Sequence, residues 1–230
     1  MSNGPTALIF GFGKNVGTEV AKSFSQNGYR VATVSRSESP ASTSLGYIHI
    51  QGDLSDQTSI PSIFSDVRSK LGEPSVVIYN AAANSHMNKA DPLSIPLADV
   101  VKDLNINTVS ALIAAQEATK SFAALPSSAS KTFIFTGNIL NLQILPPLMS
   151  NGIGKCATAH FLESAATAYK ADGYKFYYAD ERKEDGAPVY NAINGEAHGK
   201  FYVELSEGRE QGPWLATFVK GIGYKDFLAK

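Results

Sequence analysis

Hydrophobic positions along the chain follow two alternating patterns. Short apolar segments, rich in β-branched and aromatic residues, are typical of strands buried in a sheet. Between them lie longer segments in which apolar residues recur at the spacing of an amphipathic helix. The predicted strands are Thr6–Gly11, Tyr29–Ser35, Tyr47–Gln51, Ser75–Tyr79, Lys131–Gly137, Lys175–Ala179 and Trp214–Val219. The predicted helices are Asn15–Gln26, Gln57–Leu71, Pro96–Leu125 (as one helix or two), Gly152–Ala171 and Glu196–Ser206.

The alternation of strands and helices determines the expected fold. Strands that are joined through helices of this length lie parallel in one sheet, because such crossovers are right-handed. We therefore expect an α/β protein, a single-domain Rossmann fold over residues 1–230, with a doubly wound parallel sheet of about seven strands and helices on both faces. Within it we expect residues 180–212 to form a substrate flap or loop region. The charged first part, Asp180–Tyr190, fits either a mobile flap or a solvated connection.

Composition and charge exclude several classes of function. The 230 residues carry a formal net charge of −1, so the chain lacks the basic surface that binds nucleic acids or anionic membranes. No apolar run approaches the roughly 18 residues of a membrane-spanning helix, and the first residues do not resemble a secretory signal. Cys156 is the single cysteine, which fits a reducing compartment, and we expect a cytoplasmic location. The four histidines and one cysteine show no metal-ligand spacing, so no metal site is predicted.

A glycine-rich turn follows the first predicted strand directly and opens the first predicted helix. Glycine permits both a tight turn and a close approach of the main chain to a diphosphate. The N-terminus of the helix then offers amide groups and partial positive charge to the phosphates. A tight turn without a ligand is the alternative, but this context favours a bound dinucleotide. The candidate cofactor contacts in the turn are Gly11, Gly13, Lys14, Asn15, Val16 and Gly17.

The end of the second predicted strand indicates which dinucleotide is bound. An acidic residue at this place would bind the ribose 2′-hydroxyl of NAD. Here the chain has Ser35 and Arg36, and a guanidinium has the fork geometry to bind a 2′-phosphate. Lys14 would add a second cation close by. We therefore expect NADP(H) in preference to NAD(H), although Arg36 and Lys14 are also explained as ordinary surface charges.

In these motifs and their order, the sequence resembles the short-chain dehydrogenase/reductase family over roughly residues 5–222. The glycine turn is similar to that of the family, with Asn15 in place of the middle glycine, a residue that tolerates unusual φ angles. The resemblance implies further cofactor contacts at Asp53 and Leu54 after the third strand and at Asn80 and Ala81 after the fourth. Asn107 matches an asparagine with structural and catalytic roles in the family.

The resemblance breaks down at the catalytic motif. The family uses a tyrosine and, four residues later, a lysine that also holds the nicotinamide ribose. Lys155 fits the lysine, but Asn151 stands where the tyrosine is expected. The family serine falls at Asn138, with Thr136 as the nearest hydroxyl. An asparagine amide can hydrogen-bond to a carbonyl but cannot donate a proton at neutral pH, so the chain is an atypical member on this interpretation.

Another side chain at the carboxyl ends of the strands could replace the tyrosine, because ligands of open α/β sheets bind there. His86 is the first alternative acid, since it titrates near neutral pH. Further candidates are Asn138, Asn141, Tyr178, Asp180 and Arg182. Asp180 and Arg182 could instead form a structural ion pair. The full set of candidate catalytic residues is Lys155, Asn107, Asn138, Asn151 and His86.

Three functions fit these observations. We favour an NADP(H)-dependent oxidoreductase that reduces a small carbonyl compound with an atypical proton donor. The alternatives are a cofactor-binding sensor or partner protein without catalysis, and a non-redox enzyme such as a cyclase or isomerase, because fold does not determine chemistry. The expected partners are a small-molecule substrate and, as the resemblance implies, further copies of the chain in a homodimer or homotetramer.

Overall fold

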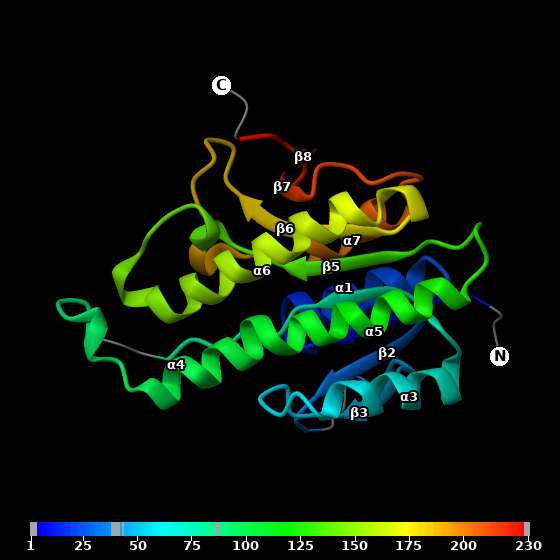
Figure 1. Ribbon diagram of the computed structural model, residues 1–230. Helices are drawn as coiled ribbons and strands as arrows, with labels where there is room; N and C mark the ends of the chain where they lie inside the picture. Colours follow the sequence, from blue (N-terminus) through cyan, green and yellow to red (C-terminus); the bar gives the residue numbers. More distant parts are fainter. Residues whose placement is uncertain (1–3, 38–41, 43, 86–87, 228–230) are drawn as a thin grey trace.

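The computed structural model describes residues 4–37, 42, 44–85 and 88–227. One sheet lies between two layers of helices (Figure 1). Its strands are β1 (Thr6–Phe10), β2 (Arg30–Ser35), β3 (Ile48–Gln51), β4 (Pro74–Tyr79), β5 (Thr132–Thr136), β6 (Lys175–Arg182), β7 (Leu215–Val219) and β8 (Gly223–Tyr224). The helices are α1 (Val16–Gln26), α3 (Ser59–Leu71), α4 (Leu97–Leu104), α5 (Ser110–Ala124), α6 (Met149–Ala168) and α7 (Gly195–Glu207).

The eight strands are ordered β3-β2-β1-β4-β5-β6-β7-β8, and every pair is parallel except β7 with β8. This confirms the expected α/β fold with a doubly wound sheet; the additional strand is the two-residue β8. The strand order reverses between β1 and β4, which is where open α/β sheets bind ligands. Helices α3, α5 and α6 pack on one face of the sheet, and α1 and α7 pack on the other.

A row of aromatic rings supports the carboxyl end of the sheet. The ring centroids of Phe10 and Tyr79 lie 5.7 Å apart, those of Tyr79 and Phe135 5.8 Å apart, and those of Phe135 and Tyr178 5.6 Å apart. The four residues come from β1, β4, β5 and β6, which are neighbours in the sheet. These buried rings give the ligand-binding edge a rigid floor, because close-packed interiors resist displacement.

The prediction of a charged loop beginning at Asp180 was wrong. Strand β6 continues to Arg182, and the side chains of its last three residues are buried. Asp180 and Arg182 form an ion pair there, as the alternative interpretation of these residues expected, with Oδ2 of the carboxylate 2.5 Å from Nη2 of the guanidinium. Since α7 also falls within residues 180–212, that region is not one continuous flap.

The long predicted helix at Pro96–Leu125 consists of two helices, α4 and α5. They are joined by a π-helical turn at Asn105–Val109. The turn changes the hydrogen-bonding register of the backbone, and Thr158 of α6 donates a hydrogen bond to the carbonyl of Asn107 at 2.8 Å. Such turns are frequent at functional sites, and this one places Asn107 beside the loop that follows β4. In the part of the chain that the structure describes, no helix is long and apolar enough to cross a membrane.

Candidate active site

Two cavities meet at the carboxyl edge of the sheet. The first cavity has a volume of about 720 Å³ and extends from the glycine turn to the ends of β5 and β6. The second cavity has a volume of about 640 Å³ and extends from the same turn to the ends of β2 and β3. They share Gly13, Asn80 and Ala82. The shared residues lie at the reversal of strand order, so a long ligand could occupy both cavities.

The three glycines of the turn serve different purposes. Gly11 has φ +84°, and a Cβ there would lie 2.6 Å from the main-chain nitrogen of Ala81. A Cβ on Gly17 would lie 2.7 Å from the carbonyl oxygen of Gly11. Both positions therefore exclude larger residues because the backbone packs too closely. A Cβ on Gly13 would meet nothing within 4 Å, so the bare main chain faces open space. This geometry fits a diphosphate that approaches the turn at Gly13.

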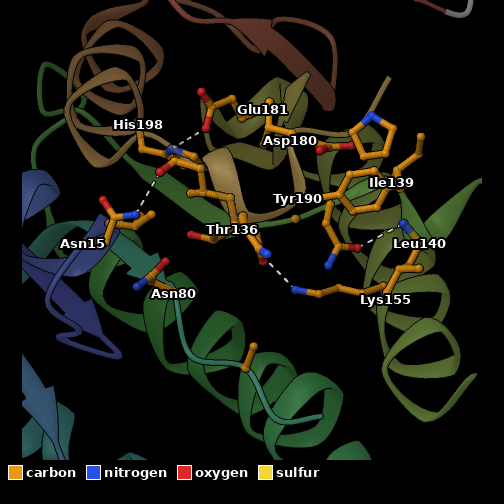
Figure 2. A pocket seen from close by; sticks show the side chains of 18 of the residues that line it. Asn15, Asn80, Thr136, Ile139, Leu140, Lys155, Asp180, Glu181, Tyr190 and His198 are labelled. Atoms are coloured by element: carbon orange, nitrogen blue, oxygen red, sulfur yellow. Dashed lines mark hydrogen bonds and ion pairs between the residues drawn. The ribbon is translucent and has the colours of Figure 1, made fainter. Parts of the chain in front are cut away.

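Asn15 stands where the family has the middle glycine of the turn, but its backbone lies outside the left-handed region, with φ −102° and ψ −95°. Its side chain instead bonds to the segment before α7: Nδ2 donates to the carbonyl of Ile193 at 2.9 Å, and Oδ1 accepts from the amide of Gly195 at 3.0 Å. Figure 2 shows this amide at one side of the first cavity. Asn15 thus connects the glycine turn with the start of α7.

The second cavity is lined by all the predicted cofactor contacts outside the glycine turn except Lys155. These are Ser35, Arg36, Asp53, Leu54, Asn80 and Ala81. Oδ1 of Asp53 accepts hydrogen bonds from the amide and hydroxyl of Ser55, and these bonds hold the pKa of the Asp53 carboxyl below its usual range. Lys102 on α4 lines the same cavity. No local sequence pattern indicated this residue, because α4 approaches the end of β2 only through the folding of the chain.

Lys14 does not accompany Arg36 as expected. It lines the first cavity, together with Asn15 and Val16, whereas Arg36 lines the second. The turn directs Lys14 away from the end of β2. The cation that shares the second cavity with Arg36 is Lys102.

Lys155 lies on the floor of the first cavity and is almost fully buried. Its Nζ donates a hydrogen bond to the carbonyl of Thr136 at 2.9 Å and lies 4.2 Å from the centroid of the Phe135 ring. Burial lowers the pKa of the Lys155 ammonium to about 7, and the nearby Asp180 carboxylate opposes this shift. The amine can therefore exchange protons near neutral pH.

Asn107 and Asn151 hold one residue of the loop after β4. The Asn107 side chain accepts from the amide of Ala83 at 2.9 Å and donates to its carbonyl at 2.7 Å. The Asn151 side chain donates to the same carbonyl at 2.9 Å. Neither asparagine lines either cavity. The Asn151 amide is thus directed at the protein main chain.

The remaining predicted residues have different positions. Asn138 lines the first cavity, and its Oδ1 accepts from the amide of Leu140 at 3.0 Å. Tyr178 lies beneath the cavity, and its hydroxyl donates a hydrogen bond to the Asn138 carbonyl at 2.8 Å. Burial raises the pKa of this tyrosine far above its usual range. His86 falls outside the described residues.

Glu181, Tyr190 and His198 were not selected as candidate site residues in the sequence analysis. All three line the first cavity (Figure 2). Oε2 of Glu181 lies 3.5 Å from Nδ1 of His198, and burial lowers the pKa of this imidazole to about 4. Their position after the sixth predicted strand could have revealed them, because ligands bind at the carboxyl ends of the strands. The charged residues there obscured the continuation of the strand to Arg182.

Comparison with known proteins identifies the group to which this chain belongs. A family model described as short chain dehydrogenase matches residues 5–176. A short chain dehydrogenase/reductase of Cryptosporiopsis sp. (strain 8999) is 48% identical over an alignment of 236 positions. The alignment covers 98% of this chain and 96% of that relative. The chain belongs to the short-chain dehydrogenase/reductase family. The predicted resemblance to that family is thereby confirmed.

Solved structures of short-chain dehydrogenases/reductases share the fold. A double mutant from Serratia marcescens matches with a TM-score of 0.78 at 16% identity, covering 95% of this chain and 97% of its own. A 3-oxoacyl-[acyl-carrier protein] reductase from Brucella melitensis matches with a TM-score of 0.77 at 16% identity, covering 89% of this chain and 90% of its own. At such low identity these structures support the fold and not a particular substrate.

Lys155 is the residue that was matched to the lysine of the short-chain dehydrogenase/reductase motif in the sequence analysis. Lys155 projects from α6 into the first cavity. Asn151 and Asn138 were matched to the family tyrosine and serine in the sequence analysis. Asn151 binds the Ala83 carbonyl, and Asn138 binds the main chain of the following turn. The wall of the cavity beside α6 is apolar, formed by Leu140, Leu145 and Leu148. The polar groups gather at the opposite wall, after β6.

Proposed function

We propose that this chain is an NADP(H)-dependent oxidoreductase that reduces a small carbonyl compound. The observation that carries the proposal is the pair of joined cavities at the glycine turn, with a guanidinium in one and a buried lysine in the other. When bound, NADPH would supply the hydride. The chain's own residues would bind the two halves of that cofactor, orient the carbonyl and supply the proton.

Arg36 is the residue that would select the phosphorylated ribose. Its side chain is exposed and lines the second cavity, so its guanidinium can offer paired N–H donors to a 2′-phosphate. Lys102 on the facing wall adds a second positive charge. The residues at this edge thus favour an anion where an NAD-specific site would favour a hydroxyl.

Lys155 would hold the nicotinamide ribose. A charged ammonium has three N–H donors, and one of them is used by the Thr136 carbonyl. The other two are available to ribose hydroxyls at the floor of the first cavity. The apolar wall beside α6 would then pack against a substrate that has a substantial hydrocarbon part.

Turnover of model carbonyl compounds tests this proposal. The purified chain is mixed with NADPH and either 9,10-phenanthrenequinone or 4-nitrobenzaldehyde, and NADPH absorbance is followed. Oxidation of NADPH with formation of the alcohol or hydroquinone is the expected result. If NADPH binds but neither probe is reduced, the proposal of carbonyl reduction fails. A converted substrate without net oxidation of NADPH would point to non-redox chemistry on this scaffold.

A cofactor-binding protein without catalysis is the second candidate, and one observation favours it. The side chain at the family tyrosine position, Asn151, is directed at the Ala83 carbonyl and away from both cavities. In that case NADPH would bind with an affinity similar to that of related enzymes, and both probes would be left unreduced. Binding and turnover measured on one protein preparation therefore separate the two candidates.

We also propose that the chain forms a homodimer or homotetramer. Apolar side chains on α4 and α6 are exposed: Leu97 is 76% exposed, Val101 47% and Ile153 45%. Exposed apolar surface on packed helices is often covered by another subunit. Light scattering should give a multiple of the mass of 24.5 kDa, and Val101→Glu should shift the protein toward monomer.

A further inference from the structure

Among the described residues that line the first cavity, Tyr190 is the only tyrosine. It comes from the segment after β6, not from α6, where the family motif carries its tyrosine. Tyr190 is 56% exposed. Figure 2 shows its ring on the side of the cavity where Ile139 and Lys155 lie. Thr136 is the only other hydroxyl-bearing residue among those that line the cavity.

The backbone of Tyr190 has an unusual conformation. Its φ is +48°, and it is the only non-glycine residue with positive φ in the described part of the chain. This region crowds the Cβ of an L-residue and is rare for large side chains. Such strain persists when the surrounding structure enforces it, and it is concentrated at functional sites. Glycine or asparagine would be the expected residue if only the turn mattered.

Contacts on both sides of Tyr190 hold the segment that carries it. The segment 188–195 begins with a bridge to the end of β6. Near its other end, the amide of Asn194 donates to Oε2 of Glu181 at 2.8 Å, and the Asn15 side chain donates to the carbonyl of Ile193 at 2.9 Å. The segment is therefore attached to β6 at its first end, and to both β6 and the glycine turn near its other end. These contacts fix where the tyrosine enters the cavity.

Four other ionisable groups at the cavity already have partners. They are Lys155, Asp180, Glu181 and His198. Asp180 is paired with Arg182, whose Nε donates to Oδ2 at 2.6 Å. Nδ1 of His198 lies 2.8 Å from the Asn194 carbonyl, which can only accept, so the neutral ring donates its single N–H there. Lys155 donates to a main-chain carbonyl.

We propose that Tyr190 is the proton donor of this site and takes over the role of the tyrosine that α6 lacks. This inference rests on the proposed carbonyl reduction. Each turnover consumes one hydride, which reduced nicotinamide supplies to the carbonyl carbon, and one proton. The Tyr190 hydroxyl gives that proton to the carbonyl oxygen as the C=O π bond breaks, and an alcohol forms. The phenolate then recovers a proton from water, which reaches it because the side chain is half exposed.

Replacement of the hydroxyl alone tests the proposal. Tyr190→Phe keeps the ring, and Tyr224→Phe on β8 is the matched control, because Tyr224 is also partly exposed but does not line the cavity. NADPH oxidation is measured with 4-nitrobenzaldehyde and 9,10-phenanthrenequinone, and NADPH affinity by calorimetry. We expect kcat of Tyr190→Phe to fall about 100-fold or more, which is typical for loss of a general acid. The Kd for NADPH should stay within about twofold, since the hydroxyl is not required for cofactor binding.

A second variant separates chemistry from folding. Asparagine tolerates positive φ, so Tyr190→Asn should keep or raise the melting temperature while kcat falls as in Tyr190→Phe. If Tyr190→Phe keeps the kcat of the parent protein while the parent reduces the probes, Tyr190 is not the donor and the proposed function stands. If the parent binds NADPH but reduces neither probe, both this inference and the proposed carbonyl reduction are overturned.

Discussion

Asn15 and Gly195 are hydrogen-bonded across 180 positions of the sequence, from Gly195 N–H to Asn15 Oδ1 at 3.0 Å. This contact is possible because Gly195 has no side chain. A Cβ there would lie 2.6 Å from Oδ1 of Asn15 and 2.8 Å from its main-chain oxygen. Through this close approach, the glycine turn and the segment that carries Tyr190 form one structural unit.

Gly195→Ala should therefore destabilise the protein. The added methyl group collides with main chain as well as side chain, and we expect a loss of about 1–3 kcal/mol in the free energy of unfolding. Gly152→Ala is the matched control, since its Cβ would find its nearest neighbour at 3.9 Å and alanine favours a helix by up to about 1 kcal/mol. Urea unfolding measures both. Equal stability of the two variants would contradict the account of Asn15 and Gly195.

Arg36→Ala should weaken the binding of NADPH and leave that of NADH nearly unchanged. Loss of charge-assisted hydrogen bonds to a 2′-phosphate costs about 1.5–3 kcal/mol, which corresponds to a Kd roughly 10-fold to 100-fold higher. Lys14→Ala is a matched control, because Lys14 lines the first cavity and its loss should leave the ratio of the two affinities unchanged. Calorimetric titration with both nucleotides measures the effect. A similar loss of affinity for NADH would show that Arg36 does not select the phosphorylated ribose.

Lys155 should make the stability of the protein depend on pH in a defined direction. Its pKa is lowered from 10.5 to about 7 in the folded chain, so between these values the unfolded chain binds more protons. Stability then rises with pH, by at most about 1.4 kcal/mol per pH unit for one group. Lys155→Met removes this dependence. We expect the variant to be more stable than the parent near pH 7 and the difference to shrink as pH rises toward 10.

Unfolding of the parent and of Lys155→Met at several pH values tests this expectation. Ionisable groups that do not interact with Lys155 contribute equally to both proteins, so the difference reports on Lys155 and on Asp180, whose pKa the Lys155 charge lowers. A difference that is constant with pH would mean that the pKa of Lys155 is not lowered by folding.

Asn107→Ala should cost more stability than Asn151→Ala. Asn107 makes two hydrogen bonds to the main chain of Ala83. Its removal leaves the main-chain N–H of Ala83 without this acceptor. Asn151 makes one of two bonds to the Ala83 carbonyl, so that oxygen stays satisfied without it. We expect about 2 kcal/mol or more for Asn107→Ala and about 1 kcal/mol for Asn151→Ala. Denaturant unfolding of the two variants measures the order, and the reverse order would contradict it.

The sequence was sufficient for the parts of the structure that depend on local patterns. The strands and helices follow from apolar periodicity, and the turn at Gly11, Gly13 and Gly17 follows from the steric needs of a strand-to-helix connection. The parallel direction of the strands in one sheet follows from their connection through helices. These rules act over short stretches of chain, so they can be applied to the amino-acid sequence alone.

The parts that could not be predicted depend on contacts between distant segments. Asp180 and Arg182 read as loop residues because charge is rare in a buried strand, yet their mutual ion pair allows the strand to continue. The amide of Asn15 finds its partners only when α7 packs on α1. Tyr190 enters the first cavity because those contacts hold its segment. No local pattern marks any of these three outcomes.

Isothermal titration of NADPH and NADH into the purified chain tests the central claim most directly. The account predicts heat with both nucleotides, and an affinity for NADPH at least about tenfold higher, because the glycine turn holds the diphosphate and Arg36 the 2′-phosphate. If neither nucleotide gives a binding isotherm at millimolar concentration, the two cavities do not form a dinucleotide site and the proposed function is contradicted.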